Sequence, residues 1–551
     1  MPVAVRALNQ PDLNAEWQRL EREVEGRLHK ASPFAAPCFE DFESPECLDV
    51  RKNYIEELHR TDKTGAYIQS QWETCQATQV QCLLDHTNPN NLDATFGQNC
   101  GQGSVSDYFV DVQNENDVKA AFKFSRRNAI PIVIRNTGHD YKGRSSAPGS
   151  LGLWTHNLKS ISYNPEFVPN GCKGVTPRQG VTMGAGVQWG QAYPFAQANN
   201  ITLVGGSDKA VGSVGGWLQG GGHGPLSNTM GLGVDRVLEY KVVTPDGKYR
   251  VANECQNEDL FWALRGGGGG TFGVVLEATM LASPTVKLQT VILTFQVPNI
   301  TRTTEAWEIL TDNGLKWAED GWGGYGISSA IILINPVLSP AEAAKSIAPL
   351  VEFGERIKAE GTGTVRLIVT EFPSFAAFFA AFTNDFVASV GKPLALASRL
   401  VNKDNFRTPE KRKELVSAML AADAATPGLI MLISAPASVP STGQTSVTEA
   451  WRDSLYHVTV IAPWNWNTTK EEISGQYKKA SESIDSLRRI TPDAAYVNES
   501  DVLEPNFEVS FWGEHYPRLL RLKKKYDPEQ LLDCWHCVGW KRSSPRFSCY
   551  L

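Results

Sequence analysis

The amino-acid sequence predicts an α+β protein of two domains, the second of them built on an antiparallel sheet covered by helices. Its 551 residues exceed what one hydrophobic core usually organises. Residues 107–282 combine a strand–helix–strand pattern with two dense glycine clusters. Beyond about residue 284 the glycine density falls, and strand-like segments alternate with helices. We therefore expect a glycine-rich, ligand-binding domain followed by a second domain.

The composition excludes several classes of protein. Hydrophobic residues make up 42% and charged residues 21% of the chain, which are ordinary values for globular domains. The formal net charge of −7 lacks the basic surplus of nucleic-acid-binding proteins, and the basic run 523–525 lies in a helical pattern typical of a solvated face. No stretch of about 18 apolar residues is present. We expect neither a nucleic-acid partner nor a membrane span.

Cysteines and glycosylation sequons together favour an oxidising environment. Ten cysteines are present. Six of them form short-spaced sets, namely Cys38 and Cys47, Cys75 and Cys82, and Cys534 and Cys537. Asn-x-Ser/Thr sequons begin at Asn200, Asn299, Asn467 and Asn498. Residues 1–12 contain no apolar core of signal-peptide length. We interpret the combination as a secreted glycoprotein with disulfides, whose signal segment is absent from this sequence.

One cysteine pair also has the spacing of half a zinc site, in Cys534-Trp-His-Cys537. No second half-site of matching spacing occurs elsewhere in the sequence. We therefore favour a disulfide or buried thiols at this pair, and we expect no bound metal.

The first hundred residues mix helical charge patterns, such as residues 16–27, with loops that carry proline and cysteine, and we expect an extension wrapped on the main body. Residues 108–112 then predict a strand, and residues 115–128 an amphipathic helix with Asn114 near its N-cap. Residues 130–135 predict a buried strand that leads into a glycine-bearing loop. Such loops are where open α/β sheets bind ligands.

The two glycine clusters span residues 215–224 and 265–273. Between them, the apolar segments 237–244 and 249–251 flank Pro245-Asp246-Gly247, which predicts a hairpin. Neither cluster is followed by the Gly-Lys-Ser/Thr of a P-loop, and neither opens a βαβ unit with an acidic residue about twenty positions on. We interpret them as backbone packed against a flat, polyanionic ligand.

The second domain is predicted from strand-like and helical segments that alternate along the chain. The strand-like segments are residues 287–297, 327–334, 365–370, 429–434 and 457–463, and the helical ones are 341–359 and 409–422. The tail, residues 506–532, predicts a further helical stretch. We find no internal repeat and no low-complexity tract.

Four motifs stand in order along the chain, namely PIVIRNTGHDYKGRS (131–145), VGSVGGWLQGGGHGPLSNTMGLGVDRV (211–237), DLFWALRGGGGGTFGV (259–274) and NFEVSFWGEHYPRLLRLKKKYDP (506–528). They resemble those of the vanillyl-alcohol oxidase and berberine bridge enzyme family, and the pattern is most similar to fungal secreted members. The resemblance covers about residues 100–551 and implies the two-domain, PCMH-type FAD-binding fold. On this basis we expect an N-terminal extension (1–100), an FAD-binding domain (101–283), a substrate domain (284–489) and a C-terminal segment that returns to the FAD-binding domain (490–551).

The resemblance also implies FAD bound covalently through His139, because the loop histidine of this family bonds to the flavin 8α-methyl group. The alternative is a turn histidine that hydrogen-bonds the backbone. Many relatives form a second link through a cysteine shortly before the first glycine cluster, but here Asp208 stands near that place, and no cysteine lies between Cys172 and Cys255. We therefore predict a single covalent bond. The residues expected to hold FAD are His139, Arg135, Asn136, Thr137, Gly138, Asp140, Gly143, Gly212, Ser213, Gly216, Gly220, Gly221, Gly222, Gly273, Val275 and Asn498.

Two candidates for the catalytic base follow from departures from the family pattern. Segment 452–462 resembles the family's strand that carries a Glu or Gln base, but that position falls near Thr459, which cannot act as a base. His457 lies on the same face of the strand and can take a substrate O–H proton, although a buried structural histidine is an equal alternative. Glu499 replaces a tyrosine that assists deprotonation in the family, and it becomes the second candidate.

Three further residues are expected beside the flavin. Tyr141 follows the tethering histidine by two positions, where a family tyrosine either borders the reacting carbon or shields the flavin. Asn498 would lie close to the flavin, so we expect its sequon to be unoccupied. His223 has no sequence partner with the spacing of a metal site, and we expect it to pack near the flavin.

The implied function is that of an FAD-dependent oxidase. It would transfer hydride from an alcohol, carbohydrate or secondary metabolite to the flavin, with a protein base taking the proton and O2 reduced to H2O2. The partners are then a small-molecule substrate and O2, and we expect a monomer. Two alternatives stay open: an oxidative or non-redox cyclase of a biosynthetic pathway, and a non-catalytic binding protein with a flavin fold.

Overall fold

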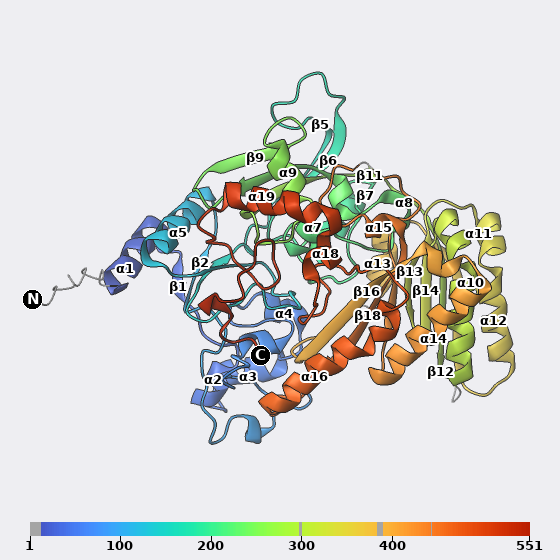
Figure 1. Cartoon of the computed structure of the whole chain (residues 1–551), viewed down its shortest axis with the longest axis horizontal. Helices are drawn as coiled ribbons and strands as arrows, with labels where there is room; N and C mark the ends of the chain where they lie inside the picture. Colours follow the sequence, from blue (N-terminus) through green and yellow to red (C-terminus); the bar gives the residue numbers. More distant parts are fainter. Residues whose placement is uncertain (1–12, 297–299, 383–388, 442) are drawn as a thin grey trace, which may run out of the picture.

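The computed structural model describes residues 13–296, 300–382, 389–441 and 443–551. The first twelve residues, the predicted strand end at residue 297 and the sequon at Asn299 lie outside these ranges. Strands within the ranges form a four-stranded, a five-stranded, a two-stranded and a seven-stranded sheet. Figure 1 shows the seven-stranded sheet and its helices at one side of the molecule, with the C-terminal helices between it and the remaining sheets. The fold is α+β, as predicted.

The four-stranded sheet contains the predicted strand–helix–strand unit. Its order is β1-β2-β4-β3, with β2, β4 and β3 parallel and β1 antiparallel to β2. The elements are β1 Leu28–Lys30, β2 Tyr108–Asp111, α5 Glu115–Asn128, β3 Ile132–Arg135 and β4 Leu151–Trp154. Asn114 caps α5 in a capping box with Asp117, which satisfies backbone N–H groups that a helix start leaves unpaired. The unit thus delivers β3 into the loop that begins at Asn136.

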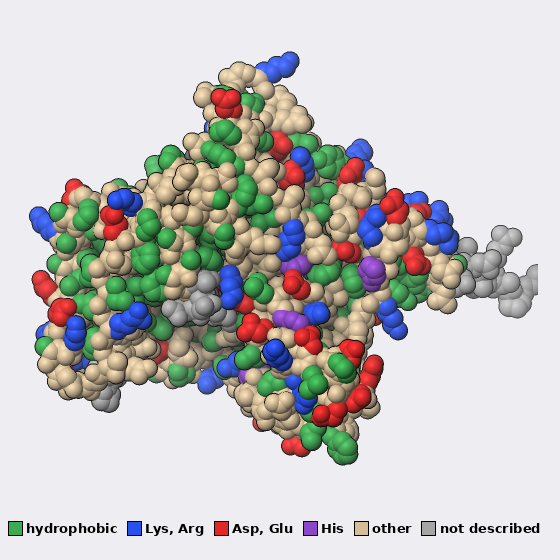
Figure 2. All heavy atoms as spheres, turned by 180° about the vertical axis from the view of Figure 1, so that it is seen from behind, with side chains coloured by type: hydrophobic (Ala, Val, Ile, Leu, Met, Phe, Trp, Pro, Cys, Tyr) green, Lys and Arg blue, Asp and Glu red, His purple; other side chains and the backbone are tan. Residues whose placement is uncertain are grey.

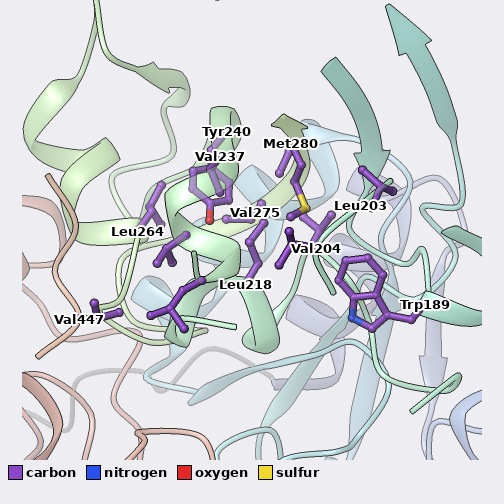
Figure 3. Packing of buried hydrophobic residues seen from close by; sticks show 14 of the residues in the cluster. Trp189, Leu203, Val204, Leu218, Val237, Tyr240, Leu264, Val275, Met280 and Val447 are labelled. Atoms are coloured by element: carbon purple, nitrogen blue, oxygen red, sulfur yellow. The ribbon is translucent and has the colours of Figure 1, made fainter. Parts of the chain in front are cut away.

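The five-stranded sheet is antiparallel throughout, in the order β5-β6-β10-β8-β9. Its strands are β5 Ile161–Phe167, β6 Arg178–Gly184, β8 Val237–Val243, β9 Tyr249–Asn253 and β10 Val274–Leu281. Strands β8 and β9 confirm the predicted hairpin. Figure 3 shows the core beside this sheet, where Trp189, Leu218 and Tyr240 converge with Val275. Val275, which we expected to hold FAD, therefore places its side chain in this core.

The seven-stranded sheet is also antiparallel, in the order β15-β12-β14-β13-β17-β18-β16. Its strands are β12 Leu288–Gln296, β13 Gly323–Ile327, β14 Ala330–Asn335, β15 Thr364–Phe372, β16 Leu394–Asn402, β17 Ile430–Ile433 and β18 Ser454–Pro463. The sequence predicted β12, β15, β17 and β18. It merged the end of β13 with β14 into one strand, and it missed β16. Helices α10 (Ile300–Asp320), α12 (Ala348–Ala359) and α14 (Pro409–Ala425) cover this sheet in Figure 1.

Two predicted helical stretches are broken in the structure. The stretch 341–359 divides into α11 (Pro340–Ser346) and α12, because Pro349 lies in the first turn of α12, where its missing N–H costs nothing. The tail divides into α18 (Phe507–Trp512) and α19 (Tyr516–Tyr526). Gly513 ends α18 with a φ of 53°, a conformation that favours glycine.

The remaining helices and strands are short and connect the sheets. They are α1 Leu13–Glu23, α2 Ala36–Glu40, α3 Pro45–Lys52, α4 Glu57–Thr61, α6 Trp189–Ala198, β7 Ile201–Thr202, α7 Gly216–Gly220, α8 Ser227–Met230, α9 Glu258–Leu264, β11 Ser283–Pro284, α13 Phe375–Phe382, α15 Ala450–Asp453, α16 Lys470–Ser483 and α17 Asp485–Arg488. Helix α1 packs on α5, so the N-terminal extension lies against the four-stranded sheet.

All ten cysteines are disulfide-bonded. The pairs are Cys38–Cys47, Cys75–Cys549, Cys82–Cys100, Cys172–Cys255 and Cys534–Cys537. The preference for a disulfide over zinc at Cys534 is therefore confirmed, whereas the neighbours Cys75 and Cys82 bond to other partners. Such a set of disulfides is typical of extracellular-type proteins.

On the face shown in Figure 2, basic and acidic side chains are interspersed. In the part of the chain that the structure describes, no helix has both the length and the apolar character that crossing a bilayer requires.

The disulfide between Cys75 and Cys549 should contribute strongly to stability, because it joins positions 474 residues apart and restricts the unfolded chain. We expect a Cys75→Ser/Cys549→Ser variant to lose about 2–5 kcal/mol, measured as a lower thermal midpoint by circular dichroism. The matched control removes Cys534–Cys537, which spans only 3 positions and should cost less. Equal midpoints for the two variants would contradict this account.

Candidate functional site

Arg135, the last residue of β3, anchors the loop that follows this strand. Its guanidinium donates to the backbone carbonyls of Thr64 and Ala66 and lies 4.6 Å from the ring centre of Tyr67. The carbonyl of Gly138 in turn accepts a hydrogen bond of 3.1 Å from the Ile68 N–H. Arg135 therefore joins the N-terminal extension to the loop, and its guanidinium positions the loop from the inside.

Asp140 and Arg144, which both belong to this loop, stabilise it by pairing with each other. The Asp140 carboxylate accepts from the backbone N–H of Arg144 at 2.6 Å and of Lys142 at 3.2 Å, and it forms an ion pair with the Arg144 guanidinium. Burial alone would raise the pKa of Asp140, but Arg144 more than offsets it and lowers that pKa. Asp140 is thus a charged brace of the loop.

Gly143 lets the loop approach an aromatic wall. It has a φ of +71°, and a Cβ there would lie 2.2 Å from the Trp72 ring. The Trp72 indole N–H also donates to the Tyr141 carbonyl at 3.2 Å. A glycine is required at this position for close packing, and the ring fixes the backbone that carries His139 and Tyr141.

Two glycine-rich segments form a floor beside the loop. A Cβ on Gly212 or Gly215 would lie 2.6 or 2.8 Å from the Asn136 amide nitrogen. A Cβ on Gly269 would lie 2.8 Å from the Cα of Gly216. The first glycine cluster therefore packs on the Asn136 side chain of the β3 loop and on the backbone of the second cluster. Ser213, also expected at this site, donates its hydroxyl to the Val187 carbonyl at 2.9 Å.

Asn498 joins this floor to the loop. Its amide nitrogen donates to the Gly216 carbonyl at 2.8 Å and to the Tyr496 hydroxyl at 2.7 Å, and its oxygen accepts from Arg144 at 3.0 Å. A Cβ on Gly220 would lie 2.4 Å from the same amide nitrogen. Because this nitrogen is engaged twice, the geometry favours the predicted absence of a glycan at Asn498. Asn200 and Asn467, by contrast, are exposed.

The remaining predicted glycines differ in role. Gly221 and Gly222 have φ values of +138° and +73° and follow α7, and the Gly222 N–H donates to the Tyr496 hydroxyl at 3.2 Å. A Cβ on Gly273 would lie 2.7 Å from the Val243 carbonyl oxygen, so this glycine serves the contact with β8. Thr137 is buried in the loop.

The surroundings of the His139 ring indicate whether the site can hold a cofactor. Its Nε2 atom is buried and has no hydrogen-bond partner among the described residues. Burial lowers the pKa of His139 and favours the neutral imidazole, which has a free lone pair. Nearby, a Cβ on Gly216 would meet no atom within 4 Å. An unpartnered imidazole beside a glycine-lined floor fits FAD, which offers a bond to the ring and a flat surface to the backbone.

A second cluster joins His223, His457 and Glu499. The Glu499 carboxylate lies 3.3 Å from His223 Nε2 and 2.9 Å from His457 Nε2, one oxygen for each ring. His223 follows α7, His457 lies on β18, and Glu499 belongs to the C-terminal segment. Burial would raise the pKa of Glu499, but the two imidazoles more than offset it, so that pKa is lowered. Burial lowers the pKa of His457. The carboxylate is therefore ionised between two imidazoles.

Known proteins resemble this chain in both sequence and fold. A family model described as "FAD binding domain" matches residues 106–253, and one described as "Berberine and berberine like" matches residues 495–534. The chain is 38% identical to the FAD-linked oxidoreductase ffsJ of Aspergillus flavipes, over 95% of this chain and 92% of that protein. The chain belongs to the vanillyl-alcohol oxidase and berberine bridge enzyme-like family of FAD-linked oxidoreductases.

Two further relatives agree with this membership. The FAD-linked oxidoreductase cheF of Chaetomium globosum is 37% identical over 97% of this chain and 88% of its own. The VAO-type flavoprotein MtVAO615 from Myceliophthora thermophila superposes with a TM-score of 0.84 at 26% identity, and 97% of each chain is covered. Members of this family bind FAD and act on small-molecule substrates.

Asp208, which we expected near the place of the family's flavin-linking cysteine, belongs to a charged network. Its charge acts on His139. Burial and the charge of Asp208 raise the pKa of Glu57 to about 7. Glu57 also forms an ion pair of 3.1 Å with Lys209. The residue expected near the cysteine position is therefore part of a charged network.

Tyr141 lies within the electrostatic reach of the second cluster. Burial raises the pKa of Tyr141, and the charge of Glu499 raises it further. The same two causes raise the pKa of Tyr496. Both phenols therefore stay protonated at neutral pH and can donate hydrogen bonds, whereas neither can serve as a base.

His223 is the residue whose role the sequence missed. We expected it to pack near the flavin, since the sequence shows no partner with the spacing of a metal site, and the structure adds a contact with Glu499, which lies 276 positions away. Its other ring nitrogen, Nδ1, lies 3.0 Å from the Ser434 hydroxyl. No local sequence signal predicts such a contact. Thr459, at the position of the family's base, is buried on β18 opposite Ser398.

The open space at Gly216 gives a direct test of the floor. Gly216→Ala should fold normally, because its Cβ meets no protein atom within 4 Å. If FAD rests there, an added methyl group should cost about 1–3 kcal/mol and weaken FAD binding about 5- to 150-fold. The measurement is the FAD content of the refolded or reconstituted protein at limiting FAD. Gly475→Ala, also free of contacts within 4 Å, is the matched control. An unchanged FAD affinity in Gly216→Ala would refute the interpretation that FAD rests on this glycine-rich segment.

Proposed function

We propose that this protein is a secreted FAD-dependent oxidase with FAD attached through a single covalent bond, to His139. Its substrate is an alcohol, a carbohydrate or a secondary metabolite, and O2 is the electron acceptor, with H2O2 as product. The observation that carries the proposal is the buried, unpartnered Nε2 of His139 beside the glycine floor. A neutral imidazole with a free lone pair is the form that can bond to the flavin.

The single link is supported by the state of the cysteines. All ten are disulfide-bonded, so none is free to bond to the flavin. Asp208 occupies the neighbourhood of the missing cysteine and cannot form such a thioether. These five disulfides also support the proposed secretion, since they form and persist in oxidising compartments.

The chemistry divides between the bound FAD and the side chains. FAD supplies the acceptor for the hydride. His457 and Glu499 form the group that takes the O–H proton of the substrate. His457 is neutral because burial lowers its pKa, and Glu499 holds the ring at 2.9 Å. Tyr141, kept protonated, donates a hydrogen bond at the border of the reacting carbon.

The domain arrangement follows the same division of tasks. We propose that residues 101–283 and 490–551 bind FAD and that residues 284–489 form the substrate domain. In support, Asn498 and Gly216 are hydrogen-bonded to each other, whereas His457 reaches Glu499 from the seven-stranded sheet. The site therefore lies where the three parts meet.

The test is a substrate panel of alcohols, sugars and aromatic metabolites, read out by peroxide release and by bleaching of the flavin band under anaerobic conditions. A substrate of the wild type should lose about 10²- to 10⁴-fold in turnover with His457→Gln or Glu499→Gln at unchanged FAD content. Glu482→Gln, on the exposed side of α16, is the matched control. Full turnover in both site variants, or a flavin that no substrate bleaches, would contradict the proposal.

A further inference from the structure

Three ligand-type atoms converge beside the proposed flavin site. One ring nitrogen each of His223 and His457 and one carboxylate oxygen of Glu499 all lie within 4.8 Å of one another. Glu499 Oε1 lies 3.3 Å from His223 Nε2, and Glu499 Oε2 lies 2.9 Å from His457 Nε2. Bonds of about 2.0–2.2 Å to a tetrahedral Zn²⁺ separate neighbouring ligand atoms by roughly 3.3–3.6 Å. The cluster therefore needs only small shifts to hold such an ion.

The two imidazoles are fixed by a surrounding shell, as metal-ligating histidines usually are. The Ser434 hydroxyl lies 3.0 Å from His223 Nδ1, on the side of the ring opposite Glu499. Trp451 and Tyr496 pack against both rings, with ring centres 5.2–5.8 Å apart. The Ser398 hydroxyl donates to the backbone carbonyl of Glu499. The rings are therefore held in place by packing as well as by the carboxylate.

The charge of Glu499 has no permanent cationic partner in the ion pairs of the described residues. Its only such contacts are with His223 and His457. Each of its two oxygens faces one imidazole nitrogen, and a carboxylate oxygen beside histidines is a common ligand in zinc sites. A cation at the centre of the cluster would balance this charge.

One side of the cluster is open. The side chains of His457 and His223 are 0% and 9% exposed, whereas that of Glu499 is 24% exposed. Tyr141 and Tyr325 lie near enough for the charge of Glu499 to contribute to raising the pKa of each phenol. Catalytic zinc sites of the two-histidine, one-glutamate type likewise leave a position for water or substrate.

We propose that His223, His457 and Glu499 bind a divalent transition-metal cation of the Zn²⁺ type, with one coordination position open to a substrate oxygen. Imidazole with carboxylate suits zinc and similar ions better than Mg²⁺ or Ca²⁺, which prefer oxygen ligands alone. The proposal that the cation binds rests on the geometry of these three residues. The action of the cation on a substrate rests on the proposed function.

The cation would act as a Lewis acid on the substrate hydroxyl. The substrate O–H bond breaks, its electron pair stays on the oxygen that the cation binds, and the proton passes to water, so that with the cation bound His457 and Glu499 act as its ligands and water takes their place as proton acceptor. The cation is neither oxidised nor reduced.

The experiment uses the holoenzyme, dialysed against EDTA and then titrated with ZnCl2 by calorimetry, with FAD content measured on the same sample. We expect one Zn²⁺ per chain. His223→Gln and His457→Gln should weaken binding by more than about 100-fold, and Ser434→Ala, which leaves the ligands in place, by about 10- to 100-fold. His29→Gln, whose ring is exposed on β1, should bind as the wild type does.

Absence of a zinc-binding transition in the wild type, or equal affinity in His457→Gln, would overturn the inference. An unchanged flavin band in Ser434→Ala shows that the fold is intact, so equal zinc affinity in that variant would also count against it. The two proposals fail separately. If substrates bleach the flavin but the protein binds no zinc, only the metal site is refuted. If the protein binds zinc but no substrate reduces the flavin, only the proposed oxidation is refuted.

Discussion

One carboxamide holds the site of this protein together. Asn498 donates to the Gly216 carbonyl and accepts from Arg144, so one side chain joins the C-terminal segment, the glycine floor and the β3 loop. The amide offers both a donor and an acceptor, whereas a carboxylate has no donor. The next residue along the chain is Glu499, which therefore enters the space between His223 and His457. The contact of the β3 loop with the glycine floor and the position of Glu499 between the two histidines both depend on these hydrogen bonds of Asn498.

Close backbone contact is the second constraint, and the glycines serve it in different ways. Gly212, Gly215 and Gly269 leave no room for a Cβ because protein atoms already stand there. Gly216 has room on its open side, which is the side where we place FAD. The floor is thus glycine-rich partly for its own packing and partly for the cofactor, and His139 stands at its edge with an unpartnered nitrogen.

Features set by neighbouring residues could be predicted from the sequence. The cap at Asn114 gave the start of α5, and the Pro-Asp-Gly turn gave the β8–β9 hairpin. Features set by distant residues could not. The disulfide of Cys549 joins positions 474 residues apart, and the edge strand β16 forms because β18 lies beside it. The cluster around His223 depends on partners from two other segments, so its spacing in the sequence carries no signal.

The most direct test of the account is where the flavin is attached. The purified, acid-precipitated protein is digested with trypsin, and the flavin-fluorescent peptides are sequenced by mass spectrometry. The account predicts one FAD per chain, on the peptide of residues 136–142 that contains His139, and none on a cysteine. Flavin released into the acid supernatant, or a flavin bonded to any other residue, would contradict it.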